Sequence, residues 1–141
     1  MFADEHIQGY FCQRCKKEVL GVKEVKVSQL PHALIIHINR LAEFDSVTKV
    51  KNPVDFPLEG FNLADFIENK KNKLMADVEF KLTGVVVHFG TANRGHYVAY
   101  VRHEGTGGWV EINDLRVREV NASQMMDVAK ENVYMLVYER E

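Results

Sequence analysis

The 141-residue sequence predicts an α+β fold, in which one antiparallel β-sheet carries one or two short helices. Three observations support this prediction. Apolar residues recur with the spacing of strands along most of the chain, Gly-containing turns separate these segments, and helical spacing is confined to two short stretches. No internal repeat or linker-like stretch divides the chain, so we expect one domain.

The N-terminal third predicts two strands. Residues 19–30 (VLGVKEVKVSQL) alternate valines with charged or polar residues, as a half-buried strand does. Pro31 marks the turn that follows. Residues 32–41 (HALIIHINRL) then predict a more deeply buried strand, because residues 33–36 are all apolar.

The middle of the chain predicts a loop followed by a helix. Residues 42–60 are loop-rich, and Pro53 and Pro57 confine any strand there to the edge of a sheet. Residues 62–75 (NLADFIENKKNKLM) place apolar side chains at helical spacing, with Asn62 as the N-cap.

The C-terminal half predicts four strands and a second helix. The strands are expected at residues 78–90, 95–104, 108–114 and 133–140. Thr-Gly-Gly at 106–108 predicts the tip of a hairpin between the second and third of them. Residues 121–132 (NASQMMDVAKEN) predict a short helix that Asn121 or Ser123 opens.

Composition excludes several classes of protein. A net charge of −2 and a pI near 6.3 give no broad basic surface, so we expect no nucleic-acid partner. No apolar run approaches the roughly 20 residues of a membrane span, and the N-terminus lacks a signal-peptide core, so we expect no membrane association. Two cysteines are too few for a secreted disulfide scaffold. We therefore expect a cytoplasmic or nuclear protein.

His96 is the strongest candidate for a catalytic side chain, because Gly-His-Tyr places it where a loop becomes a strand. If residues 96–103 and 109–115 pair as a hairpin, Asn113 or Asp114 can approach its imidazole. An imidazole oriented in this way can deprotonate a thiol or a hydroxyl. By itself a His…Asn-Asp pair is a weak signal. His88 and His37 lie inside apolar strands, and we interpret them as packed structural residues.

Cys12 and Cys15 have the C-x-x-C spacing of two ligands of a tetrahedral zinc site. Neither resembles a nucleophile, because no helix begins behind them to lower a thiol pKa. A redox role is disfavoured for the same reason, since a strand follows. His6 is a poor third ligand. The sequence therefore predicts half of a zinc site, and two reduced cysteines in a hairpin remain the alternative.

Several segments together resemble the catalytic domain of the ubiquitin-specific proteases, over nearly all of residues 10–140. They are YFCQRCKK, LPHALIIHINRL, VDFPL, FKLTGVVVHFGTANRGHYVAYVR, GGWVEINDLRV and VYMLVYER. The G-H-Y-V-A-Y, W-x-x-x-N-D and Y-x-L-x-Y blocks are highly specific in combination. HINRL departs mildly from the usual H-L-K-R-F of the family, which affects a packing contact and nothing catalytic.

The resemblance implies the palm and lower fingers of a papain-like cysteine protease fold, as a single partial domain that is the C-terminal half of the catalytic domain. Residues 10–40 correspond to the lower fingers with the C-x-x-C, and residues 41–141 to the palm. In this family His96 is the general base, Asn113 the third member of the triad, and Asp114 an auxiliary acidic neighbour. The cysteine box and a second C-x-x-C are missing, which implies the N-terminal half of the domain as a partner.

The resemblance also implies a substrate and a reaction. The family hydrolyses the isopeptide bond at the C-terminus of ubiquitin by thiol attack, so ubiquitin or ubiquitinated proteins are the expected partners. The loop FGTANRG, with Gly90 and Gly95, shapes the entry of the glycine tail, and Tyr97 is a further substrate-binding residue. We expect the chain alone to be inactive. The alternative is a catalytically inactive module that binds ubiquitin or a partner on the same fold.

Overall fold

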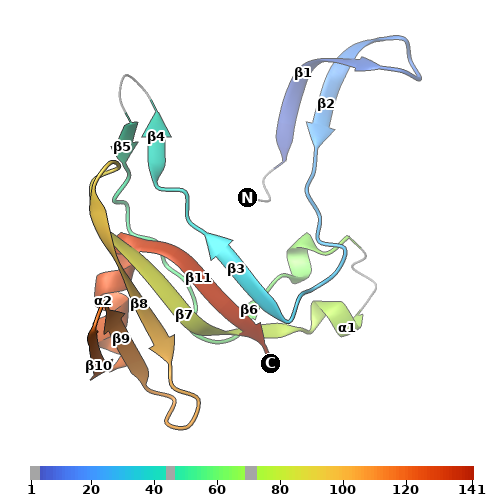
Figure 1. Cartoon of the computed structure of the whole chain (residues 1–141). Helices are drawn as coiled ribbons and strands as arrows, with labels where there is room; N and C mark the ends of the chain where they lie inside the picture. Colours follow the sequence, from blue (N-terminus) through green and yellow to red (C-terminus); the bar gives the residue numbers. More distant parts are fainter. Residues whose placement is uncertain (1–3, 44–46, 69–72) are drawn as a thin grey trace. The chain divides into compact units, whose positions relative to one another are not determined.

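The computed structural model describes residues 4–43, 47–68 and 73–141 of the chain (Figure 1). The chain divides into two compact units, which are described separately below. The first contains residues 1–30 and 62–78, and the second contains residues 31–61 and 79–141. Among the described residues, no helix combines the length and the apolarity that crossing a membrane requires.

The first unit contains a two-stranded antiparallel ribbon. Strand β1 (Glu5–Cys12) pairs with β2 (Lys17–Lys23), and a tight turn joins them. The prediction of a half-buried strand over 19–30 is wrong in its bounds and its burial, because β2 ends at residue 23 and Leu20 is 64% exposed. A ribbon of two strands has no second layer of its own to cover a face, so alternation here does not produce burial.

The helix predicted over residues 62–75 is not continuous. The structure has one 3-10 turn, η1 (Ala64–Phe66), and one short helix, α1 (Lys73–Ala76), and the four residues 69–72 lie outside the described part. The Asn62 side chain accepts a hydrogen bond from the backbone N–H two residues later at 2.6 Å, as a residue that opens a helical turn does, but the turn lasts only to Phe66. Ile67 is extended (φ −73°, ψ 133°) and forms a bridge with Val27. Apolar spacing is therefore produced here by a turn and a bridge.

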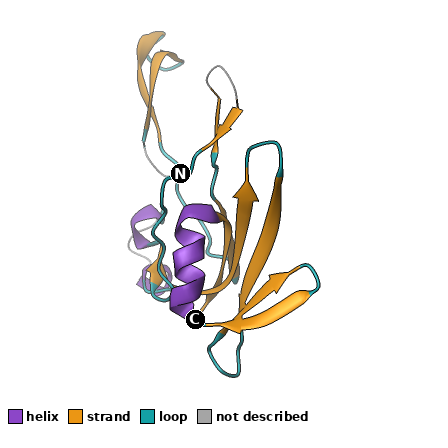
Figure 2. Cartoon of the chain, turned by 90° about the vertical axis from the view of Figure 1, so that its left-hand side faces the viewer, coloured by secondary structure: helices purple, strands orange, loops and turns teal. Residues whose placement is uncertain are grey.

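The second unit is built on an antiparallel sheet with the strand order β10-β9-β8-β7-β11-β3, and β6 (Phe61–Asn62) also pairs with β7 (Figures 1 and 2). The strands of that order are β3 (Ala33–His37), β7 (Glu79–Gly90), β8 (Gly95–Arg102), β9 (Trp109–Asn113), β10 (Arg116–Val120) and β11 (Val133–Arg140). A separate ribbon consists of β4 (Leu41–Glu43) and β5 (Val47–Lys49). The four strands predicted in the C-terminal half are confirmed, and β10 was not predicted.

One face of this sheet forms the core, and helix α2 (Ala122–Asn132) packs against β7 on that face (Figure 2). Asn121 caps α2 in a capping box with Gln124, so the first of the two predicted alternatives, Asn121 or Ser123, is the one that opens the helix. The largest buried side chains of the face are Phe80, Leu82, Val85, Val87, Val98, Tyr100, Trp109, Met125, Val133, Leu136 and Tyr138.

The opposite face of the sheet is aliphatic and partly exposed. Register places Ile35, Val137, Gly84 and Val101 in one row across four strands. Ile35 is 61% exposed, so the prediction of a deeply buried strand over 32–41 is wrong. β3 is one of the two edge strands of this order, and its side chain at Ile35 is left exposed within the described residues. The apolar run reflects a face that is left open in this chain.

Arg40 is a buried cation that the sequence did not single out. Its side chain is 4% exposed and donates to the backbone carbonyls of Val133 (2.6 Å), Val50 (3.1 Å), Asn52 (3.0 Å) and Lys130 (3.2 Å). These bonds tie the loop after β5 to the end of α2 and to the start of β11. The residue belongs to the HINRL segment, where its role is to close the backbone hydrogen bonding of three segments.

Candidate functional site

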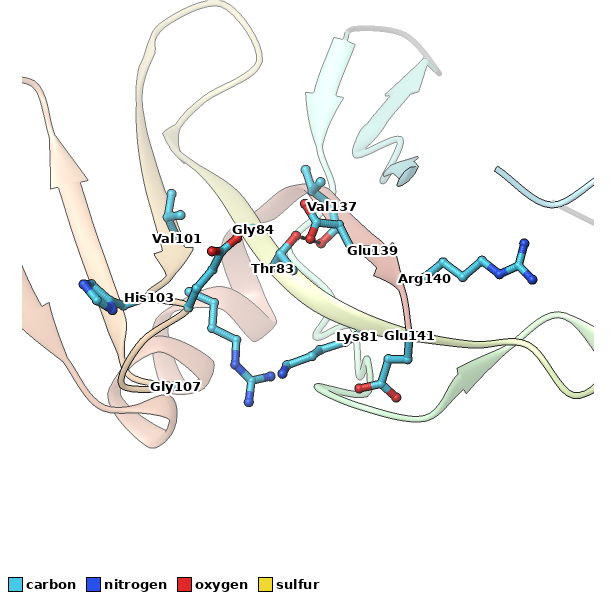
Figure 3. A pocket seen from close by; sticks show the side chains of 12 residues that line it. Lys81, Thr83, Gly84, Val101, His103, Gly107, Val137, Glu139, Arg140 and Glu141 are labelled. Atoms are coloured by element: carbon cyan, nitrogen blue, oxygen red, sulfur yellow. Dashed lines mark hydrogen bonds between the residues drawn. The ribbon is translucent and has the colours of Figure 1, made fainter. Parts of the chain in front are cut away.

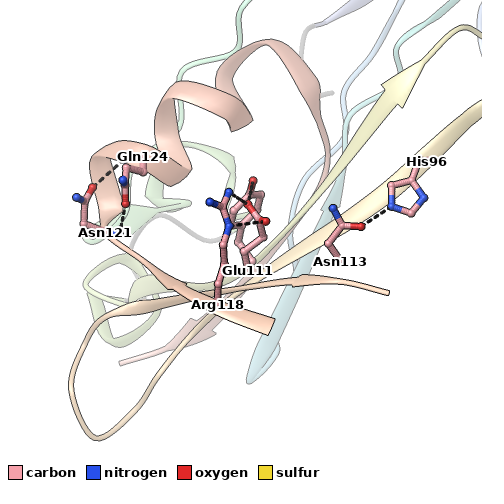
Figure 4. A network of polar contacts seen from close by, with 7 residues as sticks. His96, Glu111, Asn113, Arg118, Asn121 and Gln124 are labelled. Carbon is pink, nitrogen blue, oxygen red and sulfur yellow. Dashed lines mark hydrogen bonds and ion pairs between the residues drawn. The ribbon is translucent and has the colours of Figure 1, made fainter. Parts of the chain in front are cut away.

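His96 and Asn113 meet across two adjacent strands. His96 is the second residue of β8 and Asn113 is the last residue of β9. The Nε2 atom of His96 lies 2.7 Å from Oδ1 of Asn113 (Figure 4). The predicted contact between these two side chains is therefore present in the structure.

This contact determines which ring nitrogen can act as a base. The Oδ1 atom of Asn113 can only accept a hydrogen bond, so Nε2 of His96 carries the proton in the neutral ring. The lone pair is then on Nδ1, on the other side of the ring. An imidazole held in this tautomer is the arrangement that an amide can impose on the base of a thiol nucleophile.

Asp114 supplies a second oxygen near the same ring nitrogen. Its Oδ2 lies 3.8 Å from Nε2 of His96, beyond hydrogen-bond length but close enough for electrostatic attraction to a protonated ring. Asp114 has a positive φ of 52° in the two-residue turn between β9 and β10. Asp tolerates this left-handed conformation better than most residues. The structure thus brings all three predicted residues together, with Asn113 as the direct partner.

A hairpin aligns the two strands that carry the site. β8 and β9 pair from Ala99↔Ile112 to Arg102↔Trp109. At the turn, the His103 backbone N–H donates to the carbonyl of Gly108 at 2.8 Å. The hairpin predicted around residues 106–108 is confirmed. Alternate residues of a strand share a face, so His96 and Asn113 both point to the face that carries α2.

The loop before His96 requires glycine at both ends. Gly90 has a φ of +112°, and a Cβ there would lie 2.3 Å from the carbonyl oxygen of Arg94. A Cβ on Gly95 would lie 2.1 Å from Nε2 of His88 and 2.2 Å from the carbonyl oxygen of Phe89. Internal packing thus explains both glycines. The contact of this loop with a substrate tail stays a prediction.

Tyr97 belongs to an aromatic cluster on the aliphatic face of the sheet. Its ring lies 4.6 Å from His88 and 5.3 Å from Tyr134, and His37 packs edge-on to Tyr134 at 4.6 Å. Burial, and secondarily the charge of Lys49, lowers the pKa of His88. His88 is half-buried and packs as a structural strand residue, whereas His37 is exposed and its ring contacts Tyr134. Neither ring takes part in the His96–Asn113 contact.

The two cysteines lie together at the β1–β2 turn. The backbone N–H of Cys15 approaches Sγ of Cys12 at 3.4 Å. The backbone N–H groups of Cys15 and then Arg14 lower the pKa of Cys12, which favours the thiolate that a metal needs. His6 pairs with Val22 and lies six residues before Cys12 on the same strand, about 20 Å away at the rise of a strand. It cannot share a site with both cysteines.

The described residues contain no group of three or more His, Cys, Asp or Glu side chains arranged for a metal. The half zinc site at Cys12 and Cys15 stays a prediction.

Another surface feature is a pocket of about 650 Å³ at the other end of the sheet (Figure 3). Its floor is formed by Gly84, Val101 and Val137, and its rim includes charged side chains such as Lys81 and Glu139. His96 is not among its lining residues. The pocket therefore does not belong to the His96–Asn113 site.

A charged network beside the site was missed by the sequence analysis. The hydroxyl of Tyr100 donates to Oε2 of Glu111 at 2.9 Å. Arg118 donates to both oxygens of the same carboxylate, each at 2.8 Å (Figure 4). The sequence could have pointed to Glu111, because it precedes Asn113 by two residues and so lies on the same face of the strand.

Comparisons of the sequence with a family model and with a curated relative give the same family. The family model for ubiquitin carboxyl-terminal hydrolase matches residues 1–138. The chain is 33% identical over 132 residues to ubiquitin carboxyl-terminal hydrolase cyk-3 of Caenorhabditis elegans. That match covers 92% of this chain and 10% of the relative, so the chain spans a small part of the relative's length.

Solved structures of similar fold include the SAGA Ubp8/Sgf11/Sus1/Sgf73 DUB module bound to ubiquitin aldehyde, with a TM-score of 0.86 and 26% identity. The same module bound to monoubiquitin gives a TM-score of 0.85 and 26% identity. The matches cover 99% of this chain and 31% and 30% of those chains, respectively. The expected α+β fold is thus confirmed.

Proposed function

Because this chain belongs to the ubiquitin carboxyl-terminal hydrolase family, we propose that it supplies the general base and its orienting residue for thiol-dependent deubiquitination. The observation that carries the proposal is the 2.7 Å contact between Nε2 of His96 and Oδ1 of Asn113. The substrate is the isopeptide bond that joins the C-terminus of ubiquitin to a lysine side chain.

In the proposed reaction, Nδ1 of His96 removes the proton of a cysteine thiol. The thiolate attacks the isopeptide carbonyl carbon, a C–S bond forms, and the tetrahedral intermediate collapses with cleavage of the C–N bond. The imidazolium returns its proton to the departing lysine amine, and water then hydrolyses the thioester with His96 again as base. Asn113 keeps the ring in one tautomer and orientation throughout, and Asp114 lies beside the same ring nitrogen.

The nucleophile comes from outside these 141 residues. The chain has two cysteines, and both belong to the β1–β2 turn with the spacing of zinc ligands. The N-terminal half of the catalytic domain is therefore the proposed partner. It also supplies the second cysteine pair, so that Cys12 and Cys15 hold a structural zinc as two of its four ligands.

Ubiquitin is the proposed binding partner of the assembled domain, since two of the similar solved structures are complexes with ubiquitin aldehyde and monoubiquitin. Gly90, Gly95 and Tyr97 line the path of the ubiquitin tail in this proposal, and the protein acts in the cytoplasm or the nucleus. A non-catalytic ubiquitin-binding module is the second candidate, favoured because the two cysteines of the chain belong to the β1–β2 turn and have the spacing of metal ligands.

The test is complementation. The chain is combined with the nucleophile-bearing half of the catalytic domain, and turnover of a fluorogenic ubiquitin substrate is measured. We expect turnover from the pair, none from the chain alone, and loss in His96→Ala and Asn113→Ala. The control is His32→Ala, because His32 is exposed and the hydrogen bond that it accepts from the Arg140 N–H goes to its backbone carbonyl. Binding of ubiquitin without turnover would favour the second candidate.

A further inference from the structure

Glu111 occupies a central place in the sheet beside the proposed base. It lies on β9, two residues before Asn113, and it is paired with Tyr100 of β8 and with Arg118 of β10. The side chain of Glu111 is 12% exposed and Tyr100 is 2% exposed. A carboxylate at this depth is retained only when its oxygens are well hydrogen-bonded.

The carboxylate of Glu111 is held from both sides. Oε1 accepts a hydrogen bond from Nε of Arg118 at 2.8 Å. Oε2 accepts one from Nη2 of Arg118 at 2.8 Å and another from the hydroxyl of Tyr100 at 2.9 Å. Bidentate Arg–carboxylate pairs are geometrically specific as well as strong. Burial raises the pKa of Tyr100 to about 12, with the Glu111 hydrogen bond adding to it, so the phenol remains a donor at neutral pH. One side chain thus links three strands.

This link lies where the backbone ladder ends. Within the described residues, the pairs between β8 and β9 stop at Ala99↔Ile112, one residue before Asn113. The contact between Asn113 and His96 therefore spans the two strands beyond their last backbone pair. The Glu111–Tyr100 bond is one residue inside that point, on the same face as the contact.

We propose that Glu111 is a positioning residue: by joining β8, β9 and β10, it holds the Asn113 carboxamide against the His96 imidazole. The proposal rests on the proposed function, because it assigns a role within that same site. Glu111 is not a catalytic residue, since it touches Tyr100 and Arg118 rather than the reacting atoms.

The experiment uses a complete catalytic domain that contains this chain and the nucleophile. Glu111→Ala removes all three bonds, whereas Tyr100→Phe and Arg118→Ala each remove part of the link. The matched control is Glu59→Ala, which removes another Arg–carboxylate pair, the 2.7 Å contact with Arg102 at the far end of β8.

Two quantities are measured at a temperature where every variant is folded. The first is kcat and KM with a fluorogenic ubiquitin substrate, and the second is the ¹⁵N–¹H resonance of His96 Nε2–H in domain labelled at histidine. We expect Glu111→Ala to lower kcat on the order of tenfold or more with KM little changed, because small misplacement of catalytic groups is costly. We also expect the Nε2–H resonance to weaken through faster exchange with water. The two partial variants should show smaller changes, and Glu59→Ala none.

The outcomes separate the two proposals. If the domain is active, and Glu111→Ala has the same kcat and the same Nε2–H resonance as the control Glu59→Ala, the positioning role is refuted. If the unsubstituted domain does not turn over ubiquitin substrates, the proposed function fails, and the resonance alone then decides the positioning role. If Glu111→Ala does not fold, Arg118→Ala and Tyr100→Phe decide it, and unchanged kcat and resonance in both would refute it.

Discussion

Replacement of Gly95 by alanine tests whether internal packing, and not the substrate alone, requires glycine before the proposed base. The new Cβ would lie 2.1 Å from Nε2 of His88 and 2.2 Å from the carbonyl oxygen of Phe89. The imidazole is packed against Tyr97, and the carbonyl belongs to the backbone of β7. Neither can move away cheaply, so the strand that starts at Gly95 must shift.

Overpacking of this kind costs about 1–3 kcal/mol, and a clash with a backbone atom belongs to the upper part of that range. We expect Gly95→Ala to lower the free energy of unfolding by about 2 kcal/mol or more. At roughly 4 °C per kcal/mol for a chain of this size, Tm falls by about 8 °C. Because His96 is the next residue, the variant should also lose activity in a complete domain.

Gly84→Ala is the matched control. Its Cβ would lie 3.4 Å from the Cβ of Val137, an ordinary contact, and Gly84 lies in the same sheet. Both substitutions restrict the unfolded chain equally, which alone stabilises a protein by about 0.4–1 kcal/mol. The difference between the two variants in urea unfolding therefore isolates the clash.

A double variant separates the two contacts of the added Cβ. Adding His88→Ala to Gly95→Ala should restore only part of the loss, because the clash with the Phe89 carbonyl remains. If Gly95→Ala proves as stable as Gly84→Ala, the packing argument is refuted, and substrate approach becomes the remaining reason for glycine at this position.

Further predictions concern other parts of the chain. Arg40→Ala should lower the free energy of unfolding by about 3 kcal/mol or more in urea unfolding, since it leaves buried carbonyls unpaired, and Arg40→Lys should restore little of it. Arg118, above all through its hydrogen bonds, lowers the pKa of Glu111, so the stability due to this carboxylate is present above its unfolded pKa and lost as the pH falls through the folded one. Unfolding curves of Glu111→Gln should lack that acid-side decline, and an identical decline in both proteins would contradict the assignment. In a complete catalytic domain, zinc competition against a chromophoric chelator should show binding that Cys12→Ser and Cys15→Ser weaken equally, and unchanged binding in either variant would exclude the paired site. The exposed aliphatic face should make the isolated chain associate at micromolar concentration, and Ile35→Lys should reduce association in sedimentation, whereas a monomer that binds no hydrophobic dye would contradict this expectation.

The parts of the fold that were predictable from sequence are those decided by neighbouring residues. Alternation and glycine turns located β7, β8, β9 and β11, and Asn121 marked the start of α2. The hairpin, whose turn was visible in the sequence, placed Asn113 or Asp114 near His96, and the resemblance to the family singled out Asn113. Local signals suffice when the partner of a residue lies across a tight turn.

The wrong predictions of burial and of a helix have a different cause, because each depended on which other parts of the fold contact the segment. The apolar run at residues 33–36 indicated burial, but β3 is an edge strand with an open outer face. The helical spacing at 62–75 is interrupted at Ile67, which is extended and makes a bridge with Val27. Periodicity reports which side chains share a face, and it does not report whether another layer covers that face.

The hydrogen-bonded charges of Arg40 and Glu111 were the least predictable feature, because their partners belong to other segments that only the fold brings beside them. Arg40 donates to carbonyls of residues 10 to 93 positions away, and nothing in the HINRL segment marks it as buried. The sequence analysis did not single out Glu111, whose carboxylate is hydrogen-bonded by Tyr100 and Arg118 from the two neighbouring strands. When a charged side chain can be buried only because residues of neighbouring strands hydrogen-bond it, the sequence does not reveal this before the strand order is known. Once the order is known, the same residue becomes informative, since the energetic cost of burying a charge implies that its geometry is tightly defined.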